Sequence, residues 1–425
     1  MKKIRSAFVV IGAALWIVSC ASASPSESPS EQDPAGGSAA NTLAPDVPDT
    51  IPWPDSGRPS QELGETTASQ PAPEDDPPPI RALFDFKTDF SKHSIPYGEI
   101  LSGGPPRDGI PPVDNPKFIS VDQAGEWLQP VEPVILVQVG DDARAYPLQI
   151  LTYHEIVNDT VDGLPLAVTF CPLCNTAIVF ERMLEGQLLD FGTTGHLRYS
   201  NLIMYDRQTE TWWQQASGEA IVGELLGARL EYYPGAIIAW EEFRSSFPSG
   251  KVLSRETGFS RPYGQNPYIG YDDVNNPPFL YRGPITPGAL PPVTRVLTVD
   301  MNNEAVAYPY EVLAEARVVN DTVAGEDLVV IWEPGTASAL DTVSIADGRD
   351  VGSANAYSRR VDGQILTFRF EDGRIVDEQT GSEWNLLGMA VSGELAGNQL
   401  ESMVAINHFW FSWAAFKPET RIYNP

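Results

Sequence analysis

The order of apolar and polar positions predicts a chain built mainly of short strands. Apolar and polar residues alternate at 134–139 and at 295–299, and each segment precedes a second short strand that ends at Tyr-Pro. Gly, Asp and polar turns separate the further apolar runs at 166–170, 177–180, 188–191, 202–206 and 220–225. Helical segments are expected at 148–154 and at 236–247, where Ile237, Trp240, Phe243 and Phe247 recur every three or four residues. We therefore predict an α+β fold with mainly antiparallel sheet.

These patterns belong to an internal repeat. Ala-Tyr-Pro at 145–147 and Val-Asn-Asp-Thr at 157–160 recur at 307–309 and 319–322. The match continues through paired positions, among them Asp206 with Asp377 and Trp240 with Trp410. Ordered matches of this kind indicate a duplication. We predict two similar, mainly antiparallel β-rich halves with short helices, at 81–280 and 281–425.

The N-terminal residues predict export. Lys2, Lys3 and Arg5 precede an apolar run at 7–18, which is too short to span a bilayer comfortably. Ile-Val-Ser-Cys at 17–20 resembles the lipobox of bacterial lipoproteins, so residues 1–20 are predicted to be a lipoprotein signal peptide with lipid on Cys20. An ordinary signal peptide with an incidental cysteine is the alternative. Lipid on Cys20 would tether the protein to the outer face of the cytoplasmic membrane.

Composition narrows the classes of function. Residues 21–80 are rich in Ser, Pro and acidic residues without apolar periodicity, so we expect a disordered linker. The 425 residues carry a net charge of −29, which disfavours binding to nucleic acid. Three cysteines cannot supply a network of stabilising disulfides.

Comparison of the two halves points to the chemistry. Cys-Pro-Leu-Cys at 171–174 has no counterpart in the second half, where His154-Glu155 is likewise replaced by Ala316-Arg317. Two thiols at this spacing can close a small disulfide or bind one metal ion. As a covalent brace the pair is weak, because so short a loop removes little entropy from the unfolded chain. We therefore expect the chemistry in the first half.

Histidines supply the remaining candidates. Cys171, Cys174, His154 and His196 together would suit copper or zinc, although their spacing fits no standard zinc module. In a thiol mechanism, His154 could act instead as the base that activates a cysteine. His408 is expected to be a core or interface residue. Glu155, Arg182 and Arg207 are candidates for lining a cleft. The loop at 255–273, which contains Tyr263, Tyr268 and Tyr271, is a candidate for covering a cleft between the halves.

Several motifs together resemble one family. They are Ser-Gly-Gly-Pro-Pro-Arg-Asp-Gly-Ile-Pro at 102–111, His-Glu-Ile-Val-Asn-Asp at 154–159, Thr-Phe-Cys-Pro-Leu-Cys-Asn-Thr at 169–176, Ser-Arg-Glu-Thr-Gly at 254–258 and the aromatic segment at 408–416. This set resembles the DUF3179 family of exported bacterial and archaeal proteins of unknown function, from about residue 84 to the end. The resemblance implies that some relatives carry selenocysteine in place of a cysteine of this motif. Selenium favours a redox role over a structural one, because of its lower pKa and faster exchange.

Three functions fit these residues. The first is an extracytoplasmic lipoprotein with a thiol redox site and a redox partner protein, in which Cys171 is the nucleophile, Cys174 the resolving thiol and His154 the base. The second is a copper- or zinc-binding protein that uses Cys171, Cys174, His154 and His196. The third is a non-catalytic module that binds a glycan or peptide between the halves, with the cysteines as a local brace.

Overall fold

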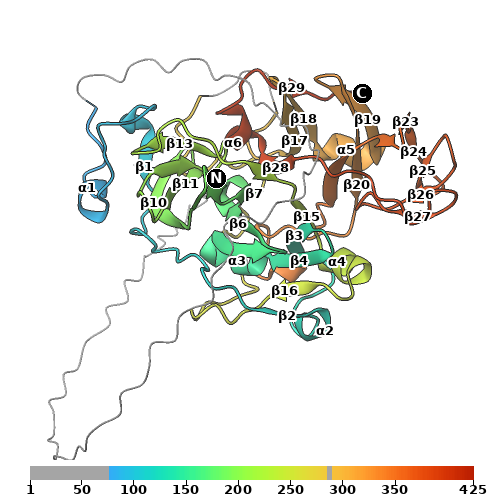
Figure 1. The fold of residues 1–425 in the computed structure, drawn as a ribbon, viewed down its shortest axis with the longest axis horizontal. Helices are drawn as coiled ribbons and strands as arrows, with labels where there is room; N and C mark the ends of the chain where they lie inside the picture. Colours follow the sequence, from blue (N-terminus) through green and yellow to red (C-terminus); the bar gives the residue numbers. More distant parts are fainter. Residues whose placement is uncertain (1–75, 285–289) are drawn as a thin grey trace, which may run out of the picture. The chain divides into compact units, whose positions relative to one another are not determined.

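The computed structural model describes residues 76–284 and 290–425 (Figure 1). The predicted signal peptide, Cys20 and the linker up to residue 75 lie outside the described residues. Both predicted halves fall within one compact unit that spans Ser60–Pro425, so the division near residue 280 stays a prediction. No helix in the described part of the chain is long and apolar enough to cross a membrane.

The largest sheet joins strands from both parts of the chain. Its order is β29 (Arg421–Ile422), β18 (Glu304–Pro309), β17 (Arg295–Met301), β28 (Ala405–Phe409), β7 (Thr176–Glu181), β6 (Leu164–Cys171) and β5 (Ile156–Val161), with β14 (Tyr232–Tyr233) also paired to β7. The pairs are antiparallel except β18 with β29. Figure 1 shows the red strand β28 beside the green strand β7, and Asn407 lies opposite Ala177 there. Residues 405–414, here named the C-terminal segment, therefore reach the start of β7, which follows the Cys-Pro-Leu-Cys motif.

The remaining strands form smaller antiparallel sheets, apart from one parallel pair, β16 with β4. Two sheets have five strands each: β1 (Ile100–Ser102), β10 (Phe191–Arg198), β11 (Asn201–Asp206), β12 (Trp212–Gln214) and β13 (Glu219–Val222); and β15 (Ala236–Ala239), β3 (Pro133–Val139), β4 (Asp142–Pro147), β16 (Lys251–Leu253) and β2 (Phe118–Ser120). The C-terminal part adds β19 (Val318–Val323), β20 (Glu326–Glu333) and β21 (Ser353–Ser358), and separately β24 (Phe368–Glu371), β25 (Arg374–Asp377), β26 (Glu383–Trp384) and β27 (Ala390–Ser392). Two ribbons pair β8 (Met183–Leu184) with β9 (Gln187–Leu188) and β22 (Arg360–Val361) with β23 (Gln364–Ile365).

The described helices are short. They are α1 (Ala82–Asp85), α2 (Val121–Ala124), α3 (Leu148–His154), α4 (Trp240–Ser246), α5 (Tyr310–Ala316) and α6 (Trp410–Ala414), with 3-10 turns η1 (Tyr97–Glu99), η2 (Pro172–Cys174) and η3 (Ile345–Asp347). Helix α3 begins directly after Pro147, whose ring fixes φ and which has no N–H to leave unpaired. It ends at His154, and the next residue, Glu155, has a left-handed φ of 57°. This reversal directs the chain into β5.

The prediction of mainly antiparallel sheets with short helices is confirmed, but the helix expected at 236–247 is partly wrong. Ala236–Ala239 form β15 and pair with β3, and α4 begins only at Trp240. Ile237 and Ile238 are both buried, which a strand between two packed faces explains. The apolar spacing alone could not separate this strand from the helix that follows it.

Two segments of the chain have the same order of elements. The order strand, strand, helix, hairpin occurs as β3-β4-α3-β5-β6 and again as β17-β18-α5-β19-β20. In each segment a later strand returns to pair with the first one, β15 with β3 and β28 with β17. A helix then starts at a tryptophan. The backbone N–H of this tryptophan donates a hydrogen bond of 2.8 Å to the carbonyl of the residue before that first strand, from Trp240 to Glu132 and from Trp410 to Thr294.

The largest hydrophobic cluster surrounds the cysteine motif. It contains both cysteines together with Phe170, which precedes them, and Phe409 and Phe411 from the C-terminal segment. Burial of this apolar surface is the main force holding the C-terminal segment against β6 and β7.

Candidate functional site

Cys171 and Cys174 lie in the loop of the β6–β7 hairpin. Strand β6 ends at Cys171, η2 covers Pro172–Cys174, and Asn175 takes a left-handed φ of 48° before β7 begins at Thr176. Cys171 and Thr176 are paired across the hairpin, so the loop between them is tight. Both cysteines are buried free thiols, with no disulfide between them.

Both sulfurs lie against the same backbone carbonyl. The carbonyl oxygen of Ser200 is 3.8 Å from the Cys171 Sγ and 3.4 Å from the Cys174 Sγ. The Cys174 side chain also hydrogen bonds to that of Cys171, so the two sulfurs are neighbours. The turn at 171–174 thus gathers two thiols at one point.

The carbonyl of Ser200 reaches the thiols through an unusual turn. Tyr199 and Ser200 form the two-residue connection of the β10–β11 hairpin, where Arg198 pairs with Asn201. Their φ angles of 52° and 67° are left-handed, a region that favours Gly or Asn over Tyr and Ser. Strained backbone of this kind persists only where surrounding contacts enforce it, and it is concentrated at functional sites.

The two thiols differ electrostatically. Burial by itself raises the pKa of the Cys171 thiol, but hydrogen bonds from the Cys174 thiol and from the N–H groups of Leu202, Cys174 and Leu173 lower it below its ordinary value. Burial, together with the neighbouring Cys171, raises the pKa of Cys174 well above its ordinary value. Cys171 is therefore the thiol that ionises first, and Cys174 keeps its proton.

Glu155 is the acidic group next to Cys171. Its backbone carbonyl accepts a hydrogen bond of 2.8 Å from the Phe170 N–H, which fixes the residue beside the end of β6. Burial, reinforced by the charge of Cys171, raises the pKa of the Glu155 carboxyl well above its ordinary value. Glu155 therefore places near the more acidic thiol a carboxyl that keeps its proton to a higher pH than an exposed glutamate does.

His154 has different partners. Its Nδ1 lies 2.6 Å from the carbonyl oxygen of Pro111 and its Nε2 lies 2.6 Å from the hydroxyl of Tyr263. Burial lowers the pKa of the imidazole. Both ring nitrogens are thus engaged away from the thiols, so these contacts lend no support to His154 as the base, which stays a prediction.

The predicted copper or zinc ligands are not found as one cluster. The Nδ1 of His196 lies 3.1 Å from the carbonyl oxygen of Thr194, and the ring packs on Trp212 with centroids 5.1 Å apart. Within residues 76–284 and 290–425, no group of three or more His, Cys, Asp or Glu side chains is arranged to hold a metal ion. The four-residue metal site stays a prediction without a matching arrangement.

Arg182 and Arg207 form ion pairs away from the thiols. Arg182 donates to Asp190 at 2.5 Å and to the carbonyl of Asp159 at 2.9 Å. Arg207 forms an ion pair with Asp114 at 2.7 Å. These bonds tie loops to the sheets, and the place of either arginine in a cleft stays a prediction.

Sequence reasoning missed several groups around the motif. The C-terminal segment contributes His408 and Ser412, both buried: the Oγ1 of Thr176 lies 2.8 Å from the Nδ1 of His408 and 3.4 Å from the Oγ of Ser412. The side chains of Ser412 and Asn201 hydrogen bond to Cys174. In the sequence, His408 is marked only by the aromatic residues that follow it, and these do not indicate which residue its ring contacts.

Residues 266–281, here named the strap, contact the motif. The hydroxyl of Tyr271 donates 2.9 Å to the carbonyl of Leu173 and accepts 3.2 Å from the N–H of Phe279. Ser200 in turn donates its hydroxyl to the Phe279 carbonyl at 2.5 Å. The strap therefore bonds both to the cysteine loop and to the strained turn.

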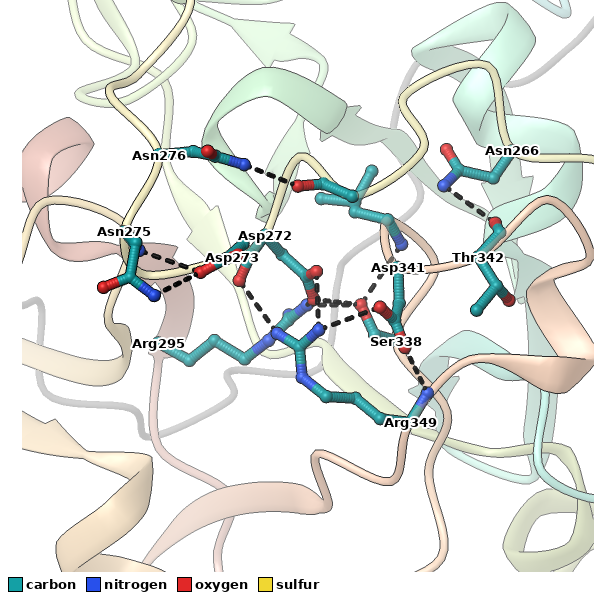
Figure 2. A network of polar contacts seen from close by, with 12 residues as sticks. Asn266, Asp272, Asp273, Asn275, Asn276, Arg295, Ser338, Asp341, Thr342 and Arg349 are labelled. Carbon is teal, nitrogen blue, oxygen red and sulfur yellow. Dashed lines mark hydrogen bonds and ion pairs between the residues drawn. The ribbon is translucent and has the colours of Figure 1, made fainter. Parts of the chain in front are cut away.

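A buried carboxylate fixes the strap to the C-terminal part. Figure 2 shows Asp272 between Arg295, Ser338 and Arg349, whose side chains donate to it at 2.7, 2.5 and 2.8 Å. Burial by itself raises the pKa of Asp272, but these donors outweigh it and lower the pKa. The carboxylate is therefore ionised at neutral pH and holds the strap in place.

Comparison with known proteins gives a family. No curated protein and no solved structure matches the chain. One family model, described as a protein of unknown function, matches residues 107–420, which include the cysteine loop, the strap and the C-terminal segment. The chain therefore belongs to the DUF3179 family.

Proposed function

We propose that this protein is a thiol redox protein whose reactive pair is Cys171 and Cys174. The observation that carries the proposal is the shared position of two free thiols with opposite pKa shifts. A thiol whose pKa is lowered next to one whose pKa is raised is the arrangement of an attacking and a resolving cysteine. A purely structural pair would not need N–H groups directed at one sulfur.

The reaction is a two-electron exchange with a disulfide substrate. The Cys171 thiolate attacks one sulfur of the substrate disulfide, which breaks the S–S bond and releases the first substrate thiolate. Cys174 then attacks the Cys171 sulfur, and the second substrate thiolate leaves with the Cys174 proton. The protein dithiol is oxidised to a Cys171–Cys174 disulfide and the substrate disulfide is reduced to two thiols.

Glu155 has a defined part in the first step. Its carboxyl keeps its proton to a higher pH than an exposed glutamate and lies near Cys171, so it can give that proton to the first leaving thiolate. The lost proton is then recovered from water. In this scheme Glu155 acts as an acid toward the leaving group, a different role from that of the base for which the sequence offered His154.

We further propose that the protein is lipid-anchored through Cys20 on the outer face of the cytoplasmic membrane, where a redox partner protein returns the pair to the dithiol state. The sequence of residues 1–20 supports this placement. In the full chain expressed in a bacterium, Cys20→Ala should move the protein from the membrane fraction to the soluble fraction. An unchanged distribution would overturn the lipid anchor.

We also infer that residues 81–280 and 281–425 arose by duplication. The repeated order of elements supports this, as does a shared hydrogen-bond motif. In each part an aspartate accepts from a threonine three residues later and from a tryptophan Nε1 at 2.9 Å, Asp206 with Trp213 and Asp377 with Trp384. In this scheme, the second copy lost its cysteines and kept the scaffold.

The proposal is tested by the reduction potential of the pair. The full-length protein is equilibrated in dithiothreitol buffers of graded potential, free thiols are alkylated, and the peptide with both cysteines is quantified by mass spectrometry. A midpoint above about −300 mV is expected, because structural disulfides lie below that value. A midpoint well below it would identify a structural brace and overturn the redox role.

Single-cysteine variants separate the two roles. After reaction with an aromatic disulfide, Cys174→Ser should hold a stable mixed disulfide on Cys171, whereas Cys171→Ser should hold almost none. Equal trapping by both variants would contradict the assignment of Cys171 as the nucleophile.

A further inference from the structure

Helix α6, which follows β28, places a serine side chain against Cys174. Strand β28 ends at Phe409, and α6 carries Ser412 in its first turn. Ser412 is fully buried, its hydroxyl is 2.9 Å from the carbonyl oxygen of Phe409, and its side chain hydrogen bonds to Cys174. The hydroxyl therefore donates to the Phe409 carbonyl and lies beside the sulfur, to which it can rotate.

Ser412 is the last member of a row of polar groups. The Nδ1 of His408 is 2.8 Å from the Oγ1 of Thr176, which in turn is 3.4 Å from the Oγ of Ser412. Thr176 also donates to the carbonyl of Cys174 at 3.2 Å. The row therefore runs from His408 through Thr176 to Ser412 and ends at the sulfur of Cys174.

His408 is an uncommon choice for a core position. It is fully buried, and its Nε2 has no hydrogen-bond partner within the described residues. Burial lowers the pKa of His408 to about 3, so the ring is neutral near pH 7. A buried polar atom without a partner costs stability, so the contribution of this ring to hydrogen bonding comes from its other nitrogen, which contacts Thr176.

We propose that Ser412 donates a hydrogen bond to the Cys174 sulfur as that sulfur becomes the attacking group, and that Thr176 and His408 are positioning residues for this hydroxyl. The inference rests on the proposed function, of which it describes the second step. While Cys174 is a thiol, Ser412 donates to the Phe409 carbonyl. As the Cys174 proton passes to the leaving thiolate, the Ser412 hydroxyl rotates and donates to the negative sulfur.

The row can orient all its protons in one direction. With the proton of His408 on Nδ1, the ring donates to Thr176. The Thr176 hydroxyl then turns from the Cys174 carbonyl to Ser412, and Ser412 donates to the sulfur. Donors joined in this way polarise one another, and bonds to a charged acceptor are the strongest of the kind. The C-terminal part has no cysteine, yet it supplies the groups that activate Cys174.

The test separates the two steps with 4,4′-dithiodipyridine, a small neutral disulfide. Attack by Cys171 releases one equivalent of thiopyridone and leaves a mixed disulfide. Attack by Cys174 on the Cys171 sulfur releases the second equivalent, which carries the Cys174 proton, and forms the Cys171–Cys174 disulfide. The two phases are followed by absorbance in single-turnover experiments on the full-length protein over a range of pH.

Two pairs of variants are compared. Ser412→Ala and Thr176→Val remove a hydroxyl from the row, whereas Thr176→Ser keeps it. Ser353→Ala is the matched control, because it removes a buried hydroxyl that bonds to Thr336 at 2.6 Å elsewhere in the C-terminal part. Thermal unfolding of each variant shows that it is folded.

We expect Ser412→Ala to slow the second phase about tenfold or more, the usual loss for a hydrogen bond to a charged group, and to move its pH profile to higher pH. Thr176→Val should slow the second phase in the same direction, Thr176→Ser should restore it, and the first phase should be unchanged. A normal first phase with an unchanged second phase in both Ser412→Ala and Thr176→Val would overturn this inference alone. Absence of a first phase in the unaltered protein would overturn the proposed function and the inference with it.

Discussion

The hydroxyl of Tyr271 donates a hydrogen bond of 2.9 Å to the carbonyl of Leu173, between the two cysteines. This bond joins the strap to the cysteine loop, and Cys171 beside it is only 2% exposed. A reagent larger than water reaches so buried a sulfur only when neighbouring contacts open, and we predict that the strap is one of those contacts.

Tyr271→Phe should therefore make Cys171 more reactive. The substitution keeps the ring and removes the bond to Leu173 together with the one from Phe279, each with a net contribution of about 1 kcal/mol. The rate of Cys171 alkylation by iodoacetamide should rise about fivefold or more. Tyr357→Phe is the control, because the buried Tyr357 hydroxyl donates 2.9 Å to the carbonyl of Leu386, elsewhere in the C-terminal part. Equal rates in the two variants would count against the strap as the barrier.

Asp272→Asn should destabilise the protein strongly at neutral pH. The change leaves Arg295, which is mostly buried, without its carboxylate, and loss of one partner of a buried pair costs about 3 kcal/mol or more. Urea unfolding measures this loss. Asp273→Asn, at the exposed neighbouring position in Figure 2, should leave stability nearly unchanged.

The pH dependence of the Asp272 contribution has a definite sign. Its pKa is lowered in the folded protein, so the stabilisation is present above the unfolded-state pKa of about 4 and is lost as pH falls through the folded-state value. The difference in free energy of unfolding between the unaltered protein and Asp272→Asn should therefore shrink as the pH drops below about 4. A difference that does not depend on pH would refute the ionic origin of the contribution.

Glu155 should behave in the opposite way. Its pKa is raised in the folded protein, so its favourable contribution is fully present below the unfolded-state pKa of about 4.3 and is lost as pH rises through the folded-state pKa. Glu155→Gln, which does not ionise, should gain stability relative to the unaltered protein by up to about 1.4 kcal/mol per pH unit over that interval. Thermal unfolding of both proteins is measured at a series of pH values from about 4 upward. A difference in melting temperature that does not change with pH would contradict the prediction.

The turn at Tyr199 and Ser200 permits a test of strain. Ser200→Ala and Ser200→Gly both remove the hydroxyl that bonds to Phe279, but only glycine adopts a φ of 67° without a steric cost. Ser200→Gly should therefore be more stable than Ser200→Ala by about 1 kcal/mol in urea unfolding. Identical midpoints would show that the turn is unstrained.

Local features of the fold were readable from the chain. Most of the predicted strand runs are strands, the segment after Pro147 is a helix, and the Cys-Pro-Leu-Cys motif is a tight turn after a strand. These features depend on contacts within a few residues, such as alternating burial, the fixed φ of proline and the short reach of a hairpin loop. The segment at 236–247 marks the limit, because its first four residues are a strand only by pairing with β3.

The surroundings of the thiols were decided by tertiary structure. The sequence by itself determined that Cys171 and Cys174 share a turn. It did not determine that Glu155 would adjoin Cys171, because that depends on the pairing of Glu155 with Phe170 at the end of β6. Nor could it bring His408 and Ser412 to Thr176, since strand register links residues far apart in the chain. Which thiol ionises first depends on burial and on N–H groups from β11 and η2, and these converge on the Cys171 sulfur only when the sheets are assembled.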